Sequence, residues 1–367
     1  MKVLVLKESA EGERRVAAVP ATVEKMARAG MEVLVQAGAG LAAGFVDAEY
    51  QTAGAKVAGD LAGDVLLKVQ RPSAEEMDRI PEGAALIAYS LQGRGAAGLR
   101  EGLQRRRITA FSLDLVPRIA RAQNMDVLSS MANIAGYKSA LLAANALGKF
   151  FPMLMTAAGT VLPAKVFVLG AGVAGLQAVA TARRLGAVVS AFDIRPAVKE
   201  QVESLGARFV GVGLDQHAED AKGYAKEVSA ETAQKERQLL LEELKATDAC
   251  ITTALVPGKR APVLVTAEMV KAMRTGSVIV DLAAEQGGNC ELTQPGKEIV
   301  AHGVTILGPV NLVSSMAFQA SQLYSRNVLN FLLHLYDKKA GKISLDRSDE
   351  IVKGCLIAHA GEVVQQI

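Results

Sequence analysis

The stretch Lys165-Val-Phe-Val-Leu-Gly170-Ala-Gly-Val-Ala-Gly175 decides the fold of this chain. An apolar run typical of a buried strand leads directly into the pattern G-x-G-x-x-G, and a helical segment, Leu176–Leu185, follows. A second apolar run, Val188–Phe192, ends at Asp193, about 20 residues after the last glycine. A strand, a glycine loop, a helix and a strand that ends in a carboxylate predict a dinucleotide-binding unit.

Each glycine of this loop has a separate physical task. Gly170 allows the tight turn, Gly172 lets the backbone approach a pyrophosphate at the helix N-terminus, and Gly175 permits close packing of helix on strand. Asp193 would accept hydrogen bonds from the adenosine ribose and repel a 2′-phosphate, which favours NAD(H) over NADP(H). Arg195 is the counter-argument, because an arginine near this position can accommodate such a phosphate.

The same alternation of strand and helix extends in both directions from this unit. Strands rich in Val, Ile and Leu that alternate with helices predict parallel sheets covered on both faces. We therefore expect an α/β protein with two doubly wound, Rossmann-like domains and a cleft between them. The predicted strands are Lys2–Leu6, Glu32–Val35, Val65–Val69, Ala85–Ser90, Ile108–Ser112, Lys165–Leu169, Val188–Phe192, Arg208–Val212, Ala249–Thr253, Ser277–Asp281 and Thr305–Leu307.

Two long helices set the predicted domain boundaries. One helix from about Val127 to Phe150 connects the domains, and a helix near Ala317–Leu333 crosses back. The prediction is a discontinuous first domain, 1–127 with 308–367, and a nucleotide-binding domain, 128–307. The tail, 340–367, has no clear element.

Two further glycine loops leave an alternative open. Gly93–Gly98 follows a predicted strand and has Asp114 downstream, and Gly38–Gly44 follows the strand that ends at Val35. Either loop could hold a second nucleotide. The alternative, which we favour, is that βα turns select glycine for positive φ.

The composition excludes several classes of protein. Of 367 residues, 50% are hydrophobic and 22% charged, with a net charge of +3, which excludes disorder and gives no basis for nucleic-acid binding. The cysteines Cys250, Cys290 and Cys355 lie far apart, so we predict no disulfide or metal site and a reducing cytosol. No signal peptide is present, and the long uncharged stretch Gly303–Ser325 contains Pro309 and polar residues, so we predict no membrane insertion.

A polar segment precedes the connecting helix. Arg118, Gln123, Asp126 and Ser129 could build a hydrogen-bonded network around a carboxamide or a ribose. The alternative is a solvated loop in which Asp126 is only an N-cap. A second polar stretch, 214–245, predicts either a mobile flap beside the nucleotide or a solvated helix.

The chain resembles the NAD(H)-binding alpha component of proton-translocating NAD(P) transhydrogenase over nearly all of residues 1–335. The motifs that carry the resemblance are RAQNMDVLSS, MTAAGT, GAGVAGLQA, KEQVESLGA, GYAKE, TTALVPGK and DLAAEQGGNC. A broader kinship with alanine dehydrogenase is visible in Lys7-Glu8, in Glu13-Arg14-Arg15-Val16, in Gly38–Phe45 and in Lys68.

The resemblance implies roles for individual residues. It implies that Arg118, Gln123 and Asp126, with Ser129 beside them, contact the nicotinamide end of NAD(H), and that Gln123 also reaches toward NADP(H) on a partner subunit. It implies a mobile loop with Gly223 and Tyr224 that closes over the nucleotide. The remaining nucleotide contacts it implies are backbone of Ala171, Gly172 and Val173 at the pyrophosphate, Ile194 against the adenosine and Leu255 as a wall.

The histidines favour transhydrogenation over amino-acid oxidation. An amino-acid dehydrogenase moves a proton with the hydride and needs a base. Where alanine dehydrogenases that resemble this chain place a histidine, Tyr89 and Ser90 stand here, and the four histidines are His217, His302, His334 and His359. Hydride transfer between two nicotinamides needs no base; it needs close rings and a dry cleft.

These arguments predict an NAD(H)-binding subunit that is active only with its partners. The resemblance implies a homodimer, an NADP(H)-binding subunit and membrane subunits that translocate protons, with the chain peripheral on the cytoplasmic side of the inner membrane. Because the sequence stops at Ile367 without a membrane segment, we expect those components on separate chains. The alternatives are an alanine-type NAD-dependent dehydrogenase and a non-catalytic NAD-binding or redox-sensing module.

Overall fold

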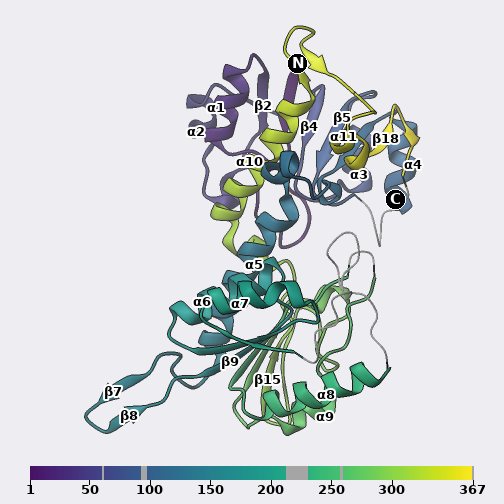
Figure 1. Ribbon diagram of the computed structural model, residues 1–367. Coiled ribbons are helices and arrows are strands. Elements are labelled where there is room, and N and C mark those ends of the chain that lie inside the picture. The colour runs from purple at the N-terminus through teal and green to yellow at the C-terminus, as the bar shows by residue number, and fades with distance from the viewer. Residues whose placement is uncertain (60–61, 92–96, 212–229, 257–258, 366–367) are drawn as a thin grey trace. The chain divides into compact units, whose positions relative to one another are not determined.

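Apolar strands flanked by glycine-rich turns form two separate parallel sheets in this chain (Figure 1). The structure is a computed structural model, and it describes residues 1–59, 62–91, 97–211, 230–256 and 259–365. The chain divides into two compact units, Met1–Met131 with Val313–Ile367, and Ala132–Leu312. Each sheet belongs to one unit, and the α/β fold with two Rossmann-like sheets is as the sequence predicts.

The first unit contains an eight-stranded sheet in the order β19-β18-β6-β5-β4-β1-β2-β3. The strands from β1 to β6 are parallel, whereas β18 pairs antiparallel with β6 and β19 with β18. The strand bounds are β1 Lys2–Val5, β2 Glu32–Gln36, β3 Lys56–Ala58, β4 Val65–Leu67, β5 Ala85–Ala88, β6 Thr109–Ser112, β18 Leu356–His359 and β19 Glu362–Val363. Its helices are α1 Pro20–Arg28, α2 Asp47–Thr52, α3 Ala74–Arg79, α4 Ala97–Arg105, α10 Ala317–Leu335 and α11 Glu350–Cys355.

The C-terminal tail corrects the sequence prediction of no clear element. It forms the small hairpin β16 Tyr336–Asp337 and β17 Lys342–Ile343, then α11, and then β18 and β19 at the edge of the first sheet. Local pattern does not reveal β18, because the partner that pairs with it, β6, lies about 250 residues earlier.

The second unit contains a seven-stranded sheet in the order β11-β10-β9-β12-β13-β15-β14. All its pairs are parallel except that β14 runs antiparallel to β15 at one edge. The strand bounds are β9 Lys165–Leu169, β10 Val188–Phe192, β11 Arg208–Val210, β12 Ala249–Thr252, β13 Val278–Asp281, β14 Glu298–Ala301 and β15 Val304–Leu307. The sequence predicts neither β14 nor the short hairpin β7 Leu154–Thr156 and β8 Gly159–Val161, which extends away from this sheet in Figure 1.

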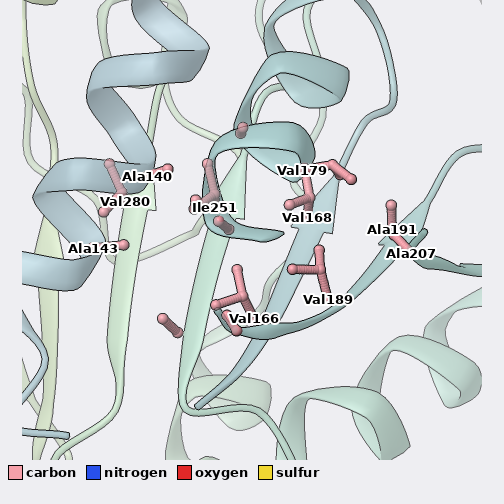
Figure 2. Close-up of a cluster of buried hydrophobic side chains, with 14 of the residues drawn as sticks. Ala140, Ala143, Val166, Val168, Val179, Val189, Ala191, Ala207, Ile251 and Val280 are labelled. Atoms are coloured by element: carbon pink, nitrogen blue, oxygen red, sulfur yellow. The ribbon is translucent and has the colours of Figure 1, made fainter. Parts of the chain in front are cut away.

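Helices cover both faces of the second sheet, as its continuous apolar strands require. In β9, Val166 and Val168 belong to one buried cluster and Phe167 and Leu169 to the other, because successive side chains point to opposite faces. Figure 2 shows the first cluster between the sheet and the helices that carry Ala140 and Val179. The helices are α6 Val173–Arg184, α7 Lys199–Ser204, α8 Ala230–Lys245 and α9 Ala267–Ala272, with the inner part of α5 Val127–Ala146.

Six short 3₁₀ turns complete the described elements. Three of them connect elements near the predicted site residues, namely η3 Ala120–Met125, η4 Pro196–Val198 and η5 Ala284–Gln286. The other three are η1 Leu41–Ala43, η2 Leu113–Leu115 and η6 Leu312–Met316.

Candidate functional site

The glycine loop lies where the order of the second sheet reverses. From β9 the chain builds outward to β10 and β11 on one side, and then returns to place β12 and β13 on the other. In open parallel sheets, ligands bind at the carboxyl ends of the strands at such a reversal. Gly170 to Gly175 leave the carboxyl end of β9 at this position.

The backbone of the loop explains two of the three glycines by local geometry. Gly170 has φ = 94°, in the left-handed region that favours glycine, and its N–H donates to the Phe192 carbonyl at 2.8 Å. A Cβ on Gly175 would lie 1.8 Å from the Gly170 carbonyl oxygen. The loop is also fastened to the next strand, because the Thr253 hydroxyl donates to the same Gly170 carbonyl at 2.9 Å. The turn is therefore closed by contacts that admit no side chain at Gly170 or Gly175.

Gly172 has a different environment. It is the N-cap of α6, and the nearest atom to a Cβ built on it is a guanidinium nitrogen of Arg195 at 3.9 Å. Among the described residues, nothing therefore requires glycine at this position. A glycine without a structural requirement, at the positive end of a helix dipole, fits a surface that an anionic group approaches closely.

Asp193 follows β10 and lies directly against the loop. The side chain is 8% exposed, and its Oδ2 accepts a hydrogen bond from the Ala171 N–H at 2.7 Å. The Arg195 guanidinium binds the same carboxylate, from Nε to Oδ1 at 2.9 Å and from a terminal nitrogen to Oδ2 at 2.8 Å. The sequence sets Asp193 against Arg195 as opposing determinants of nucleotide choice, but in the structure the two form one bidentate ion pair.

Two other predicted contacts occupy neighbouring positions in the second unit. Ile194 is half-buried and packs against the cluster that contains Phe192 and Val210. Leu255 follows β12 and is 43% exposed. Gly223 and Tyr224 lie outside the described residues, as does most of the predicted flap; its end, from Ala230 on, is the helix α8.

A buried polar network that sequence reasoning missed holds the loops after β12 and β13. Asp281 is fully buried, and its carboxylate accepts from the Thr252 and Thr293 hydroxyls and from the N–H groups of Ala283 and Cys290, at 2.7 to 3.0 Å. The only sequence signal is the family-like motif DLAAEQGGNC, which carries no information on these long-range partners.

Asn289, in the same motif, joins the two loops. It is fully buried, accepts from the Ala254 N–H at 2.9 Å, and donates to the carbonyls of Ala254 and Pro262 at 2.8 Å each. Asp281 and Asn289 thus fix the backbone beside Leu255 at the same edge of the sheet as the glycine loop.

The predicted polar segment belongs to the first unit. Arg118 and Gln123 are exposed, and Asp126 and Ser129 are half-buried. The Asp126 carboxylate accepts from the Ser129 N–H at 2.9 Å and from the Ser129 hydroxyl at 2.6 Å at the start of α5, which is N-cap geometry. The capping role of Asp126 is therefore real, and it leaves Arg118 and Gln123 as the exposed polar side chains of the four.

The loop at Gly38–Gly44 has its own structural explanation. Gly38 and Gly44 have φ values of 70° and 89°, and a Cβ on Gly40 would lie 2.5 Å from the Tyr50 hydroxyl. The Gly38 N–H already donates to the Asp47 carboxylate at 2.9 Å. These contacts favour the interpretation as a turn. Most of the other loop, residues 92–96, lies outside the described residues.

Buried ion pairs occupy the region of the first unit that resembles alanine dehydrogenase. Lys68 is fully buried, rather than a surface residue, and its Nζ lies 3.2 Å from Glu8 and 3.0 Å from Glu76. Arg15 forms a bidentate pair with Glu13. Burial acts to raise the pKa of Glu13, but the hydrogen bonds and charge of Arg15 and a hydrogen bond from Gln70 outweigh it and hold that pKa at about 2. Burial raises the pKa of Glu8, and the Lys68 charge only partly offsets it.

The two described histidines of the first unit have structural neighbours. His334 lies 3.3 Å from Asp349, and His359 lies 3.5 Å from the Thr109 hydroxyl. At the position where an alanine dehydrogenase is expected to place a histidine, the Ser90 hydroxyl lies 3.5 Å from Asp114.

Comparison with known proteins places the chain in one family. The model of the alanine dehydrogenase/PNT N-terminal domain matches residues 4–135, and that of the C-terminal domain matches residues 139–366. The chain is 48% identical to the first of the NAD(P) transhydrogenase alpha subunit chains of Rhodospirillum rubrum, over 99% of this chain and 98% of the relative. It is 31% identical to the alanine dehydrogenase of Halomonas elongata, over 99% and 94%.

A solved structure agrees with these sequence relationships. A transhydrogenase from Sinorhizobium meliloti superimposes with a TM-score of 0.91 at 45% identity, covering 99% of this chain and 100% of that one. The higher identity to transhydrogenases than to alanine dehydrogenases distinguishes the two branches. The chain therefore belongs to the alanine dehydrogenase/PNT family and, within it, to the alpha subunits of NAD(P) transhydrogenase.

Proposed function

We propose that this chain binds NAD(H) in its second unit and exchanges hydride directly with NADP(H) held by a partner subunit. The observation that carries the proposal is the loop Gly170–Gly175 at the reversal of the second sheet, with unfilled space at Gly172 and Asp193 beside it. The names of the transhydrogenase relatives support the same assignment.

The residues of the second unit fit a dinucleotide. The backbone of Ala171, Gly172 and Val173 would hold the pyrophosphate at the N-terminus of α6. Asp193 and Ile194 would contact the adenosine, and Leu255 would wall the site. Arg195 is paired with Asp193, so its guanidinium is partly neutralised as a partner for a 2′-phosphate, which supports NAD(H) over NADP(H). Gly223 and Tyr224 are proposed to close over the bound nucleotide.

The first unit would supply the polar side chains for the nicotinamide end. Arg118 and Gln123 are exposed and can turn toward a ligand, while Asp126 and Ser129 hold the start of α5. Bound NADH supplies the hydride. The task of these side chains is to orient the carboxamide and exclude water, because direct hydride transfer between two nicotinamides moves no proton that would need a base.

Proton translocation is proposed to reside in other subunits. No helix among the described residues is long and apolar enough to cross a membrane. Coupling would then act through changes in nucleotide affinity transmitted across the subunit contact. We propose that the chain acts as a homodimer, peripheral to the cytoplasmic side of the inner membrane through its partners.

The proposed function is tested by mixing the purified chain with a soluble NADP(H)-binding partner domain and following hydride transfer from NADPH to an NAD⁺ analogue. We expect transfer only when both proteins are present. We also expect no reduction of NAD⁺ by L-alanine with the chain alone. Amino-acid oxidation by the isolated chain would support the dehydrogenase alternative, and NADH binding without transfer would support a non-catalytic module.

Changing Gln123 to asparagine should slow hydride transfer by about tenfold or more while NADH affinity stays within about twofold, since small displacements of reacting groups cost this much or more. The variant keeps the amide and shortens its reach by one methylene. Single-turnover transfer and equilibrium NADH titration separate the two effects. Loss of NADH binding without a separate rate effect would disprove the role of Gln123.

Changing Asp193 to alanine should weaken NADH binding by ~1–3 kcal/mol, the cost of leaving buried polar groups unpaired. The change removes the partner of the Ala171 N–H and releases Arg195. The freed guanidinium should at the same time raise the affinity for NADPH. Calorimetric titration with both nucleotides measures this exchange, and unchanged affinity for NADH would refute the assignment of the glycine loop.

A further inference from the structure

The polar segment that carries Gln123 is fastened to the C-terminal part of the same unit. The carbonyl of Asn124, next to Gln123, accepts two side-chain amides from α10, Asn327 Nδ2 at 2.9 Å and Asn330 Nδ2 at 3.0 Å. Residues three apart lie on the same face of a helix, so the two asparagines converge on one oxygen. The backbone beside Gln123 is thus fixed by residues about 200 positions later.

A second attachment lies one turn earlier in the segment. Arg121 donates to Asp349 at 2.5 Å and lies 3.7 Å from Glu350. Asp349 is also the N-cap of α11, where its Oδ1 accepts from the N–H of Ile351 at 2.7 Å and of Val352 at 3.1 Å. Burial acts to raise the pKa of Asp349, but the hydrogen bonds from Arg121 and these N–H groups hold that pKa well below its usual range. The carboxylate that receives Arg121 is therefore itself fixed.

Between these attachments the segment turns its residues alternately inward and outward. Ala122 and Met125 are buried, whereas Gln123 is exposed. Asn327 is 6% exposed, and its Oδ1 has no hydrogen-bond partner among the described residues. Burying an unsatisfied acceptor opposes folding. Stability therefore does not account for an asparagine at 327, whereas its hydrogen bond to the Asn124 carbonyl does give it a role.

We propose that Asn327, Asn330 and Asp349 are positioning residues for Gln123, acting through the Asn124 carbonyl and through Arg121. This inference rests on the proposed function, since it assigns these attachments to the alignment of the nicotinamide. It gives the C-terminal segment, from α10 to α11, a task in hydride transfer without direct contact with the nucleotide.

The test uses two variants of the full chain, Asn327→Leu with Asn330→Ala, and Arg121→Gln. The first removes both amides from the Asn124 carbonyl, and the second breaks the ion pair while Asp349 keeps its capping role. Lys56→Gln is the matched control, because Lys56 forms a comparable exposed ion pair with Glu32, 2.9 Å long, between β2 and β3 of the same unit. Arg121→Lys is the conservative variant.

Three quantities are measured for each variant: single-turnover hydride transfer with the NADP(H)-binding partner, affinity for ADP-ribose, and the thermal midpoint. ADP-ribose lacks the nicotinamide, so its affinity reports on the second unit alone under the proposed function. We expect transfer to fall about tenfold or more in both test variants. We expect ADP-ribose affinity and the thermal midpoint to stay at wild-type values, Arg121→Lys to recover most of the rate, and Lys56→Gln to change nothing.

The inference is overturned if transfer stays at the wild-type rate, or if ADP-ribose affinity falls in parallel with it, which would indicate a general structural effect. Absence of transfer in the wild-type mixture would instead refute the proposed function. The comparison of NADH with ADP-ribose then decides the inference on the chain alone: weaker NADH binding with unchanged ADP-ribose binding in the test variants supports it, and equal changes refute it.

Discussion

A valine at position 175 is expected to abolish nucleotide binding and to destabilise the second unit. The first carbon of any side chain there would lie 1.8 Å from the Gly170 carbonyl oxygen and 3.2 Å from the Thr253 hydroxyl. Backbone cannot yield as a flexible side chain can, so the turn between β9 and α6 must open. Overpacking of a well-packed site costs about 1–3 kcal/mol and occasionally more, and we expect the upper end here. Urea unfolding and NADH titration measure the two effects.

Two other glycines of the second unit serve as matched controls for Gly175→Val. A Cβ on Gly148 would meet no described atom within 4 Å, so Gly148→Ala should change neither stability nor binding. Gly172→Ala should leave the urea midpoint unchanged, because the nearest atom is 3.9 Å away, but should weaken NADH binding by roughly fivefold or more. If Gly172→Ala binds NADH normally, the pyrophosphate does not lie where we propose.

Removal of the Asp281 carboxylate is the other change with a large expected effect. In Asp281→Ala the buried N–H groups of Ala283 and Cys290 lose their acceptor, together with two threonine hydroxyls. Each unsatisfied buried group costs ~1–3 kcal/mol, so the two N–H groups alone predict a loss of about 2–6 kcal/mol. The urea midpoint should therefore fall strongly, and Asp281→Asn should show a smaller loss because it keeps one oxygen.

The control for Asp281 is Asp346→Ala, which removes an exposed carboxylate that accepts from the Ser348 N–H. An exposed change of this kind usually stays within about 0.5 kcal/mol. A similar small effect for Asp281→Ala would mean that the loops after β12 and β13 do not depend on this network, and that their place beside Leu255 is fixed in another way.

Elements with a strong local pattern were predictable from the sequence. The strand Lys165–Leu169 is observed at its predicted bounds, and the helix after it begins three residues earlier, at Val173. The predicted helix from Ala317 is observed as Ala317–Leu335. Strand ends are less accurate: the sequence predicts Arg208–Val212 and the structure has Arg208–Val210, because the hydrogen-bonded partner determines where pairing stops.

Features that depend on distant partners were not predictable. The strand β18 exists because β6 offers an edge, and Lys68 is buried because Glu8 and Glu76 neutralise it there. The nucleotide contacts assigned to Gly170–Gly175, Asp193, Leu255 and the segment around Gln123 stay predictions for the variants above to test.

The sequence by itself determined the periodic apolar strands, the glycine loop that interrupts them and the family to which they belong, because these depend on residues close together in the chain. Only the tertiary structure decided that Asp193 binds Arg195 and the Ala171 N–H, that Asp281 gathers four donors, and that Asn124 is held by Asn327 and Asn330. A hydrogen bond depends on distance and direction between side chains, and for partners far apart in the chain these are fixed only when the whole unit has folded.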